Sequence, residues 1–458
     1  MSGLSSSIPP AASSDRRSPA RFVGIDFGTT NSVVAVADPD RAEPARVARY
    51  GAARDDASFR SLLCLWPDDD GPPGTIRAAA GPDAIEAFRT HGADSRLIQS
   101  VKSFVASPGF ESTVMFGQRY TIVDLITLLL RGLRRGAELS VGPLGPAAWC
   151  GRPVRFVGQQ ADEALALRRL EQAYARVGFA SVTFIPEPQA AAHHYARSVR
   201  GTQVCLVADF GGGTSDFTLL RVTGAGGADA DADAGATPAI DVIAQAGVGI
   251  AGDAFDQRIV EHVVSPLLGL GSTYRGMSGQ ALAVPGHYYE SLSAWHRLSM
   301  MRTRQTLKEL QDIRVTAADP QAIERFMYLL DNELGFELHA AVTEAKAQLS
   351  RAESATLRLR AGPIDIEAAL ARADFERWIA PELRTLAGCV DAMLADADLP
   401  PGRVDRVFLT GGSSLIPAVR DLFATRFGAQ RLSSGDEFFS IAAGLALAAR
   451  ESGSAAAA

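Results

Sequence analysis

Lysine is nearly absent from this sequence of 458 residues. Only Lys102, Lys308 and Lys346 occur among the 45 basic residues, so arginine supplies almost every positive side chain. The 52 acidic residues leave a formal net charge of −7. Proteins that bind a nucleic-acid backbone carry an excess of Lys and Arg, so nucleic acid is not an expected partner. Each rare lysine is a candidate for a position where a compact positive charge lies beside a phosphate.

Cysteines and long apolar runs are also scarce. The four cysteines, Cys64, Cys150, Cys205 and Cys389, lack the spacing of a zinc site or of a redox pair, which predicts buried thiols. No apolar run approaches the roughly 20 residues that span a bilayer. Residues 1–20 contain no apolar segment of the kind found in secretory signals. We therefore expect a cytoplasmic protein with no membrane partner and with flexible tails at residues 1–20 and 451–458.

Several common catalytic motifs are missing. The sequence contains no G-x-x-x-x-G-K-[ST], G-x-S-x-G or H-E-x-x-H, which excludes a P-loop, a hydrolase nucleophile elbow and a zinc protease. Residues 247–252 read GVGIAG and fit G-x-G-x-x-G, but residues 262–289 contain no Asp or Glu to bind a ribose. A dinucleotide-binding site is therefore not expected there.

One internal repeat stands out against these absences. Residues 22–36 read FVGIDFGTTNSVVAV and residues 206–220 read LVADFGGGTSDFTLL. Each is a β-rich run that ends in Asp-Phe-Gly and passes through Thr into a second β-rich run, which predicts two β-hairpins. Asp26 and Asp209 hold equivalent places.

The repeated turn has the chemistry of a phosphate site. Its glycines let backbone N–H groups approach an anion, its Thr hydroxyl can bind a phosphate oxygen, and its Asp can hold Mg²⁺ or the waters of Mg²⁺. Two such loops facing each other would bind the phosphates of a nucleotide from both sides. A third glycine turn, TGGSS at residues 410–414, joins a buried strand to a helix and points N–H groups in the same way.

The length favours two lobes over one compact core. We expect lobe I at residues 21–200, with an insertion at about 62–118, and lobe II at residues 201–450, with an insertion at about 256–351. Residues 223–238 are almost entirely Gly, Ala, Asp and Thr, which predicts a mobile loop. Residues 364–394 are expected to be helical.

Four segments together resemble the ATPase of the seventy-kilodalton heat-shock chaperone family (DnaK type), within the actin-like ATPase superfamily. They are IDFGTTNS at 25–32, PEPQAAA at 186–192, VADFGGGTSD at 207–216 and LTGGSSLIP at 409–417. The resemblance covers residues 21–450. Within the family, the sequence most resembles the short, YegD-like branch, which implies an ATPase domain alone, without a peptide-binding domain. It implies an α/β fold of two lobes, in which duplicated ribonuclease H-like mixed sheets carry flanking helices and two subdomain insertions.

The resemblance also implies roles for the matching residues. Asp26 and Asp209 would coordinate Mg²⁺ through water, Lys102 would face the γ-phosphate and the attacking water, and Glu187 and Asp216 would position water and metal. The remaining implied contacts are with ATP: the phosphates with Gly28, Thr29, Thr30, Gly211, Gly212, Gly213 and Thr214, and the adenosine side with Gly252, Lys346, Ser350, Gly411, Gly412 and Ser413.

Two departures bear on the base. The family's two adenine-flanking arginines fall on Ala347 and Leu415, and an acidic pair of the family is reduced to Asp253 followed by Ala254. We therefore expect weaker and less selective base recognition.

The resulting hypothesis is a chaperone-like protein that binds MgATP, hydrolyses it slowly and couples closure of its cleft to the nucleotide, with protein clients or co-chaperones as partners. Two alternatives share the phosphate loops. An actin-like filament ATPase is disfavoured by the two bulky insertions. A small-molecule kinase of the same superfamily would need an acceptor pocket and a catalytic carboxylate that the sequence does not identify.

Overall fold

The protein is described here from a computed structural model. The described residues are 21–457 except 40–44, 52–55, 155, 157–159, 197–198, 225–238, 277, 291, 293–297, 299–300, 333 and 434–436. The expected N-terminal tail and most of the expected loop at 223–238 lie outside the described residues. No helix among those described is both long and apolar enough to cross a membrane.

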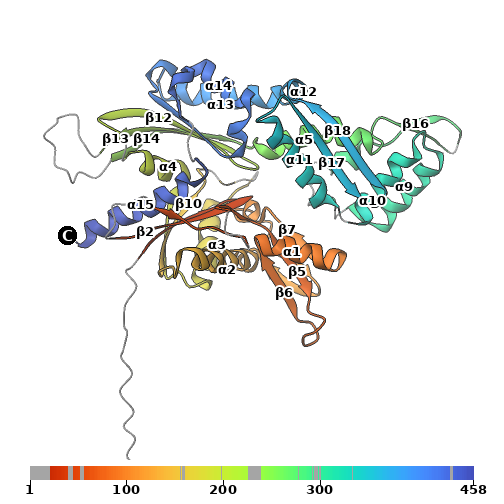
Figure 1. The fold of residues 1–458 in the computed structure, drawn as a ribbon, viewed down its shortest axis with the longest axis horizontal. Helices are drawn as coiled ribbons and strands as arrows, with labels where there is room; N and C mark the ends of the chain where they lie inside the picture. The colour runs from red at the N-terminus through yellow and green to blue at the C-terminus, as the bar shows by residue number, and fades with distance from the viewer. Residues whose placement is uncertain are drawn as a thin grey trace, which may run out of the picture.

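Two mixed sheets with the same topology form the two lobes (Figure 1). In lobe I the order is β11-β10-β1-β2-β3, with β4 also paired to β2. In lobe II it is β20-β19-β12-β13-β14. In each sheet the central strand, β1 or β12, is antiparallel to the next strand in sequence and parallel to its other neighbour. The strands are β1 Phe22–Phe27, β2 Asn31–Ala37, β3 Arg46–Val47, β4 Phe59–Arg60, β10 Ala147–Arg152 and β11 Ser181–Pro186 in lobe I, and β12 Thr202–Phe210, β13 Ser215–Thr223, β14 Ala239–Val248, β19 Arg406–Thr410 and β20 Leu432–Ser433 in lobe II.

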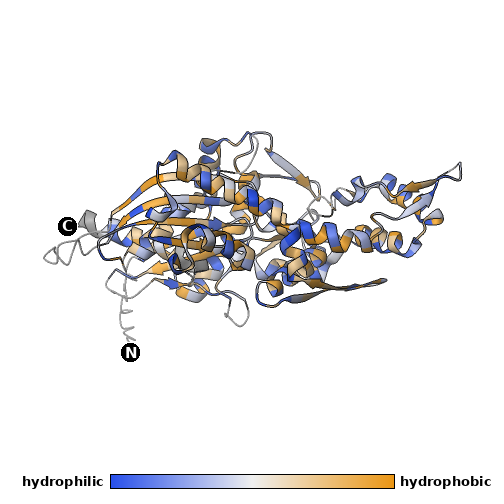
Figure 2. Ribbon diagram, turned by 90° about the horizontal axis from the view of Figure 1, so that it is seen from above, coloured by the Kyte–Doolittle hydropathy of each residue, from blue (hydrophilic) through white to orange (hydrophobic). Residues whose placement is uncertain are grey.

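Both predicted hairpins are confirmed, as β1–β2 and β12–β13. Their strands are apolar on both faces because helices cover both sides of each sheet. Hydrophobic residues, orange in Figure 2, accordingly concentrate on these strands. The predicted α/β fold with duplicated mixed sheets is confirmed.

Four helices cover the outer faces of the sheets: α2 Ile122–Val141 and α3 Glu163–Arg176 in lobe I, and α13 Ala380–Asp396 and α14 Pro417–Phe427 in lobe II (Figure 1). Helix α2 begins with a capping box, in which Thr121 Oγ1 accepts from the N–H of Asp124 and the Asp124 carboxylate accepts from the N–H of Thr121. Helix α3 is capped by Asp162, which accepts from the N–H of Leu165 at 2.8 Å.

Helices α4 (Glu187–Ala196) and α15 (Glu437–Ala457) lie between the two sheets (Figure 1). Helix α4 follows a strand of lobe I, but its alanines pack with Val207 and Leu220 of lobe II. Helix α15 follows lobe II but packs on lobe I so closely that a Cβ on Gly24 would lie 2.1 Å from the carbonyl oxygen of Ala442. The lobes are therefore joined at the base by two exchanged helices. Residues 451–457, expected as a flexible tail, continue α15, because Gly453 packs closely beside the Phe22 ring.

The first insertion contains a three-stranded sheet, β6-β5-β7, and a small hairpin, β8–β9. Its elements are β5 Leu63–Pro67, β6 Ile76–Ala80, α1 Pro82–His91, η1 Gly92–Asp94, β7 Arg96–Ile98, η2 Val101–Phe104, β8 Ser112–Met115 and β9 Gln118–Thr121.

The second insertion is mainly helical and projects from lobe II (Figure 2). Its elements are α5 Gly252–Ile259, η3 Val260–Val264, α6 Ser265–Leu267, β15 Thr273–Arg275, β16 Ala281–Ala283, α7 His287–Glu290, α9 Arg304–Thr316, α10 Pro320–Asp331, α11 Gly335–Leu349, β17 Ser354–Ala361, β18 Ile364–Ala371 and α12 Arg372–Trp378. Short turns η4 Pro401–Arg403, η5 Gly412–Leu415 and η6 Ala429–Arg431 complete lobe II.

The helix expected at residues 364–394 is wrong in its first part. Residues 364–371 form β18, which pairs with β17 around a turn at Gly362 with φ of +55°. Buried and exposed residues alternate along both strands, with Leu357, Leu359 and Ile366 on the core side. That period of two belongs to a half-buried hairpin and not to a helix.

Candidate functional site

A cleft of about 820 Å³ lies between the lobes. It is walled by the ends of the central strands β1, β12 and β19, by the first turn of α5 and by α11. The residues to which the resemblance gives a role all line it: Asp26, Gly28, Thr29, Thr30, Lys102, Glu187, Asp209, Gly211, Gly212, Gly213, Thr214, Asp216, Gly252, Lys346, Ser350, Gly411, Gly412 and Ser413. Their individual roles stay predictions. The third lysine, Lys308, lies in α9 and does not line the cleft, so it is not beside a phosphate there.

The two repeated turns face each other. A Cβ on Gly212 of the second loop would lie only 2.7 Å from the hydroxyl oxygen of Thr30 in the first. A hydrogen bond stabilises each loop. Ser61 Oγ donates to the carbonyl of Gly28 at 2.8 Å, and the N–H of Gly211 donates to the carbonyl of Thr214 at 2.9 Å. An anion between the loops would therefore contact backbone and hydroxyl groups of both lobes.

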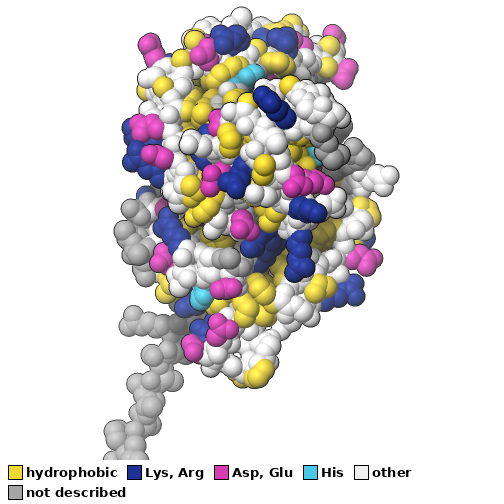
Figure 3. All heavy atoms as spheres, turned by 90° about the vertical axis from the view of Figure 1, so that its right-hand side faces the viewer, with side chains coloured by type: hydrophobic (Ala, Val, Ile, Leu, Met, Phe, Trp, Pro, Cys, Tyr) yellow, Lys and Arg dark blue, Asp and Glu magenta, His cyan; other side chains and the backbone are white. Residues whose placement is uncertain are grey.

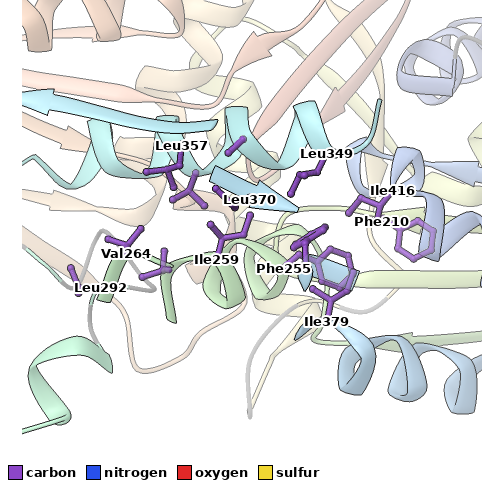
Figure 4. Packing of buried hydrophobic residues seen from close by; sticks show 14 of the residues in the cluster. Phe210, Phe255, Ile259, Val264, Leu292, Leu349, Leu357, Leu370, Ile379 and Ile416 are labelled. Carbon is purple, nitrogen blue, oxygen red and sulfur yellow. The ribbon is translucent and has the colours of Figure 1, made fainter. Parts of the chain in front are cut away.

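A single core supports the second loop and the wall beside it. Phe210, which ends β12, packs in the same hydrophobic cluster as Phe255 and Ile259 of α5 and Leu349 of α11 (Figure 4). Ile416, just before α14, joins the same cluster. Four segments from distant parts of the sequence are thereby held together beside the cleft.

Acidic side chains gather around one buried lysine at the inner end of the cleft. Lys102 Nζ lies 3.0 Å from Glu187 Oε1, and each of these two side chains is about a tenth exposed. Asp209 accepts a hydrogen bond from Thr410 Oγ1 at 2.6 Å. In the register of the antiparallel strands β12 and β13, Asp209 lies opposite Asp216. Four carboxylates (Asp26, Glu187, Asp209 and Asp216) therefore share the neighbourhood of a single ammonium group.

Crowding of these charges shifts their pKa values. Burial, with the charge of Glu187, raises the pKa of Asp26 well above its usual range and that of Asp209 to about 6. Burial, with the charges of Asp209 and Glu187, raises the pKa of Asp216 to about 7. Burial alone would lower the pKa of Lys102, but the surrounding carboxylates outweigh it and raise the value. The ammonium stays charged, and among the described residues no second positive side chain forms an ion pair with these carboxylates, so the cluster is suited to a bound cation.

The opposite end of the cleft is built on α11. Lys346 Nζ lies 2.8 Å from Asp256 Oδ1 and donates to the carbonyl of Gly252 at 3.0 Å. A Cβ on Gly252 would lie 3.1 Å from Ser413 Oγ, so η5 adjoins this wall directly. Gly411 has φ of +83°, and a side chain there would meet the carbonyl of Phe210 at 2.0 Å, so glycine is required.

Comparison with known proteins agrees with this geometry. Residues 329–453 match a family model described as Hsp70 protein. The chaperone protein DnaK of Thermus thermophilus is 27% identical over 422 residues, covering 89% of this chain and 57% of DnaK. That of Thermosipho africanus is 26% identical over 413 residues, covering 89% of this chain and 55% of its own length.

The chain is therefore similar to DnaK proteins over most of its length, and part of lobe II matches the Hsp70 model. It spans a little over half the length of these DnaK relatives. Its assignment to the short, YegD-like branch stays a prediction.

The departures from the Hsp70 pattern lie at the α11 end of the cleft. Ala347 and Leu415 both line it, and Leu415 is 45% exposed, so its apolar side chain is available to a flat ring. Asp253 also lines the cleft, and its N–H donates to the carbonyl of Gly212 at 2.8 Å. Asp253, the acidic residue kept from the family's pair, is therefore held by its backbone against the second glycine loop.

Two arginines that line the cleft were not singled out in the sequence analysis. Arg60, which ends β4, pairs with Asn31 beside the first loop, and Arg351 follows the end of α11. Arginine is the ordinary surface cation of this chain, so neither residue stood out. The available signal for Arg351 was its nearness in sequence to Ala347 and Ser350, just past the end of α11.

Proposed function

We propose that this chain binds MgATP in the cleft and hydrolyses it slowly, with closure of the lobes coupled to the nucleotide, in a chaperone-like role. The observation that carries the proposal is the approach of Gly212 to Thr30. It sets a glycine loop of each lobe against the same space, with Lys102 and the carboxylates at its inner end. Phosphoryl transfer depends on positioning and charge neutralisation, and these groups supply both.

The carboxylates fit a magnesium ion held through water. Among the described residues no three His, Cys, Asp or Glu side chains converge closely enough to ligate a metal directly. Mg²⁺ keeps several of its waters and is commonly bound by one or two carboxylates with the substrate's phosphates. Asp26 and Asp209 would hold those waters, with Asp216 and Glu187 around them. The ion would neutralise charge on the phosphates.

Lys102 would act on the reacting phosphate. Its ammonium is buried and charged, and its hydrogen bond to Glu187 fixes its position, so it can stabilise charge that develops in the transition state without reorganising. Glu187, through that bond, keeps the ammonium in place. The slow rate is inferred from the relation to Hsp70.

Closure follows from the division of the site between lobes. Gly28, Thr29 and Thr30 belong to lobe I, whereas residues 211–214 belong to lobe II, and α4 and α15 join the lobes at the base. A nucleotide bound to both loops would stabilise the closed arrangement. Protein clients or co-chaperones would respond to this change.

The test combines binding, turnover and shape. Titration calorimetry with ATP, with and without Mg²⁺, should show Mg²⁺-dependent binding. Phosphate release from bound ATP should be slow. Small-angle scattering should show that the protein becomes more compact with MgATP. Absence of nucleotide binding would contradict the proposal. ATP-dependent pelleting would instead favour a filament, and ADP release stimulated by one small-molecule acceptor would favour a kinase.

A further inference from the structure

A second cavity lies beside the cleft, between the two insertions. Its volume is about 420 Å³. Phe88 of α1 and Phe336 of α11 meet at its edge with ring centroids 6.1 Å apart and an interplanar angle of 72°. The cavity is therefore bounded by both lobes, at the end of the molecule that Figure 3 faces, where hydrophobic side chains are visible between the two halves.

The lining is apolar and aromatic. Five phenylalanines contribute to it, and among the described residues Arg96 is the one charged side chain that lines it. The phenylalanines are Phe88, Phe104, Phe110, Phe116 and Phe336. Three lining residues are also unusually exposed for their type: Phe104 and Phe116 at 39% and Val114 at 67%. Small-molecule sites have this character, mostly apolar and roughly 300–1,000 Å³ in volume.

One short turn belongs to both the cavity and the cleft. In η2 (Val101–Phe104), Val101 and Phe104 line the cavity while Lys102 lines the cleft and contacts Glu187. Gln99, Phe104 and Phe336 line both spaces. The turn is entered through Ser100, which has a left-handed φ of +56°. A molecule pressed against η2 would therefore act on the segment that positions Lys102.

We propose that this cavity binds a small uncharged aromatic molecule, and that its occupancy is coupled to the nucleotide site through η2. Aromatic rings prefer edge-to-face or offset contacts with other rings, and the lining offers these from several directions. The absence of carboxylates from the described lining, with one arginine there, gives no reason for a cationic ligand. Because the cavity is bounded by both lobes, its ligand would favour the closed arrangement.

The binding experiment uses the full chain without nucleotide. N-phenyl-1-naphthylamine, an uncharged aromatic probe that brightens in apolar surroundings, should bind saturably with one site per chain. Val114→Asp places a charge at an exposed lining position, and Phe116→Asn removes a ring while suiting the positive φ of 50° there. Each should weaken binding at least fivefold. The control Val315→Asp, at a position 73% exposed in α9 and outside the lining, should change it less than twofold. Non-saturable binding would overturn the site. So would wild-type affinity for the probe in both cavity variants.

The coupling experiment rests on the proposed ATP site and is separate from the first. At the lowest probe concentration that saturates the wild type, the Kd for MgATP should change at least threefold in the wild type and in Val315→Asp, and by less in Val114→Asp. By reciprocity MgATP must change the Kd of the probe by the same factor. Saturable probe binding with an unchanged Kd for ATP would refute coupling through η2. If the chain bound no ATP, the proposed function would fail while the probe titration would still decide the aromatic site.

Discussion

Gly212 and Thr30, which belong to different lobes, approach so closely that a methyl group on Gly212 would lie 2.7 Å from Thr30 Oγ1 and 3.3 Å from Asp253 Oδ1. Gly212→Ala should therefore push the loops apart and weaken MgATP binding about tenfold, or about 1.4 kcal/mol. Titration calorimetry measures this effect. Gly402→Ala, where a Cβ meets nothing within 4 Å, is the matched control and should leave the affinity unchanged. Equal affinities for the two variants would show that the loops need not approach.

The paired aspartates should control magnesium-dependent turnover. Asp26→Asn or Asp209→Asn removes one negative charge from the cation site while keeping the size of the side chain. Loss of a charge from such a site costs on the order of 1.5–3 kcal/mol, which lowers phosphate release by roughly tenfold or more. Titration of the rate with Mg²⁺ separates weaker metal binding from slower chemistry. Wild-type turnover in both variants would refute the phosphate-site assignment.

Lys102→Ala should separate hydrolysis from binding. The ammonium acts mainly on charge that builds in the transition state, so hydrolysis should be lost while the Kd for ATP stays within about tenfold. Calorimetry and phosphate release together test this. Lys308→Ala, in α9 and outside the cleft lining, is the control. A Lys102→Ala variant that hydrolyses ATP at the wild-type rate would exclude the assigned role.

Asp216 should make the nucleotide-free protein less stable as the pH rises. Its pKa is about 7 in the fold against an ordinary 3.8. Between these values the native state holds a proton that the unfolded chain has lost, so this contribution to stability falls from about pH 4 to pH 7. Asp216→Asn cannot ionise, and its melting temperature should therefore rise relative to the wild type between pH 5 and pH 8. A difference in melting temperature between Asp216→Asn and the wild type that stays constant with pH would contradict the assigned pKa shift.

The α11 end of the cleft should bind the base weakly. With Ala347 and Leu415 in place of two arginines, we expect ATP affinity about tenfold to a hundredfold below that of typical Hsp70 relatives, and little discrimination between ATP and GTP. Leu415→Arg should tighten ATP binding, since a guanidinium over an aromatic ring contributes about 0.5–2 kcal/mol. Leu415→Met keeps an apolar side chain and serves as the control. Sub-micromolar ATP binding by the wild type with GTP excluded would mean that other residues, Arg351 first among them, hold the base.

Much of the architecture could be predicted because its signals are local. The two Asp-Phe-Gly turns, each between β-rich runs, predicted both hairpins and the duplication of the sheets. The β17–β18 hairpin was missed because its apolar residues were assigned to a helix, although they alternate with a period of two. The extent of α15 was missed because its last turns are small, low-complexity residues, and their helix is stabilised by packing against Phe22 from the other end of the sequence.

The repeated fold and the two glycine loops follow from the sequence alone, since strand pattern, turn chemistry and motif spacing are properties of short segments. The packing of the folded chain sets which charges meet. Lys102 reaches Glu187 across 85 residues of sequence, and Lys346 reaches Gly252 across 94. It also decided that one turn, η2, faces both the nucleotide cleft and an aromatic cavity. Such pairings depend on how whole lobes pack against each other, and no single segment of the chain encodes that arrangement.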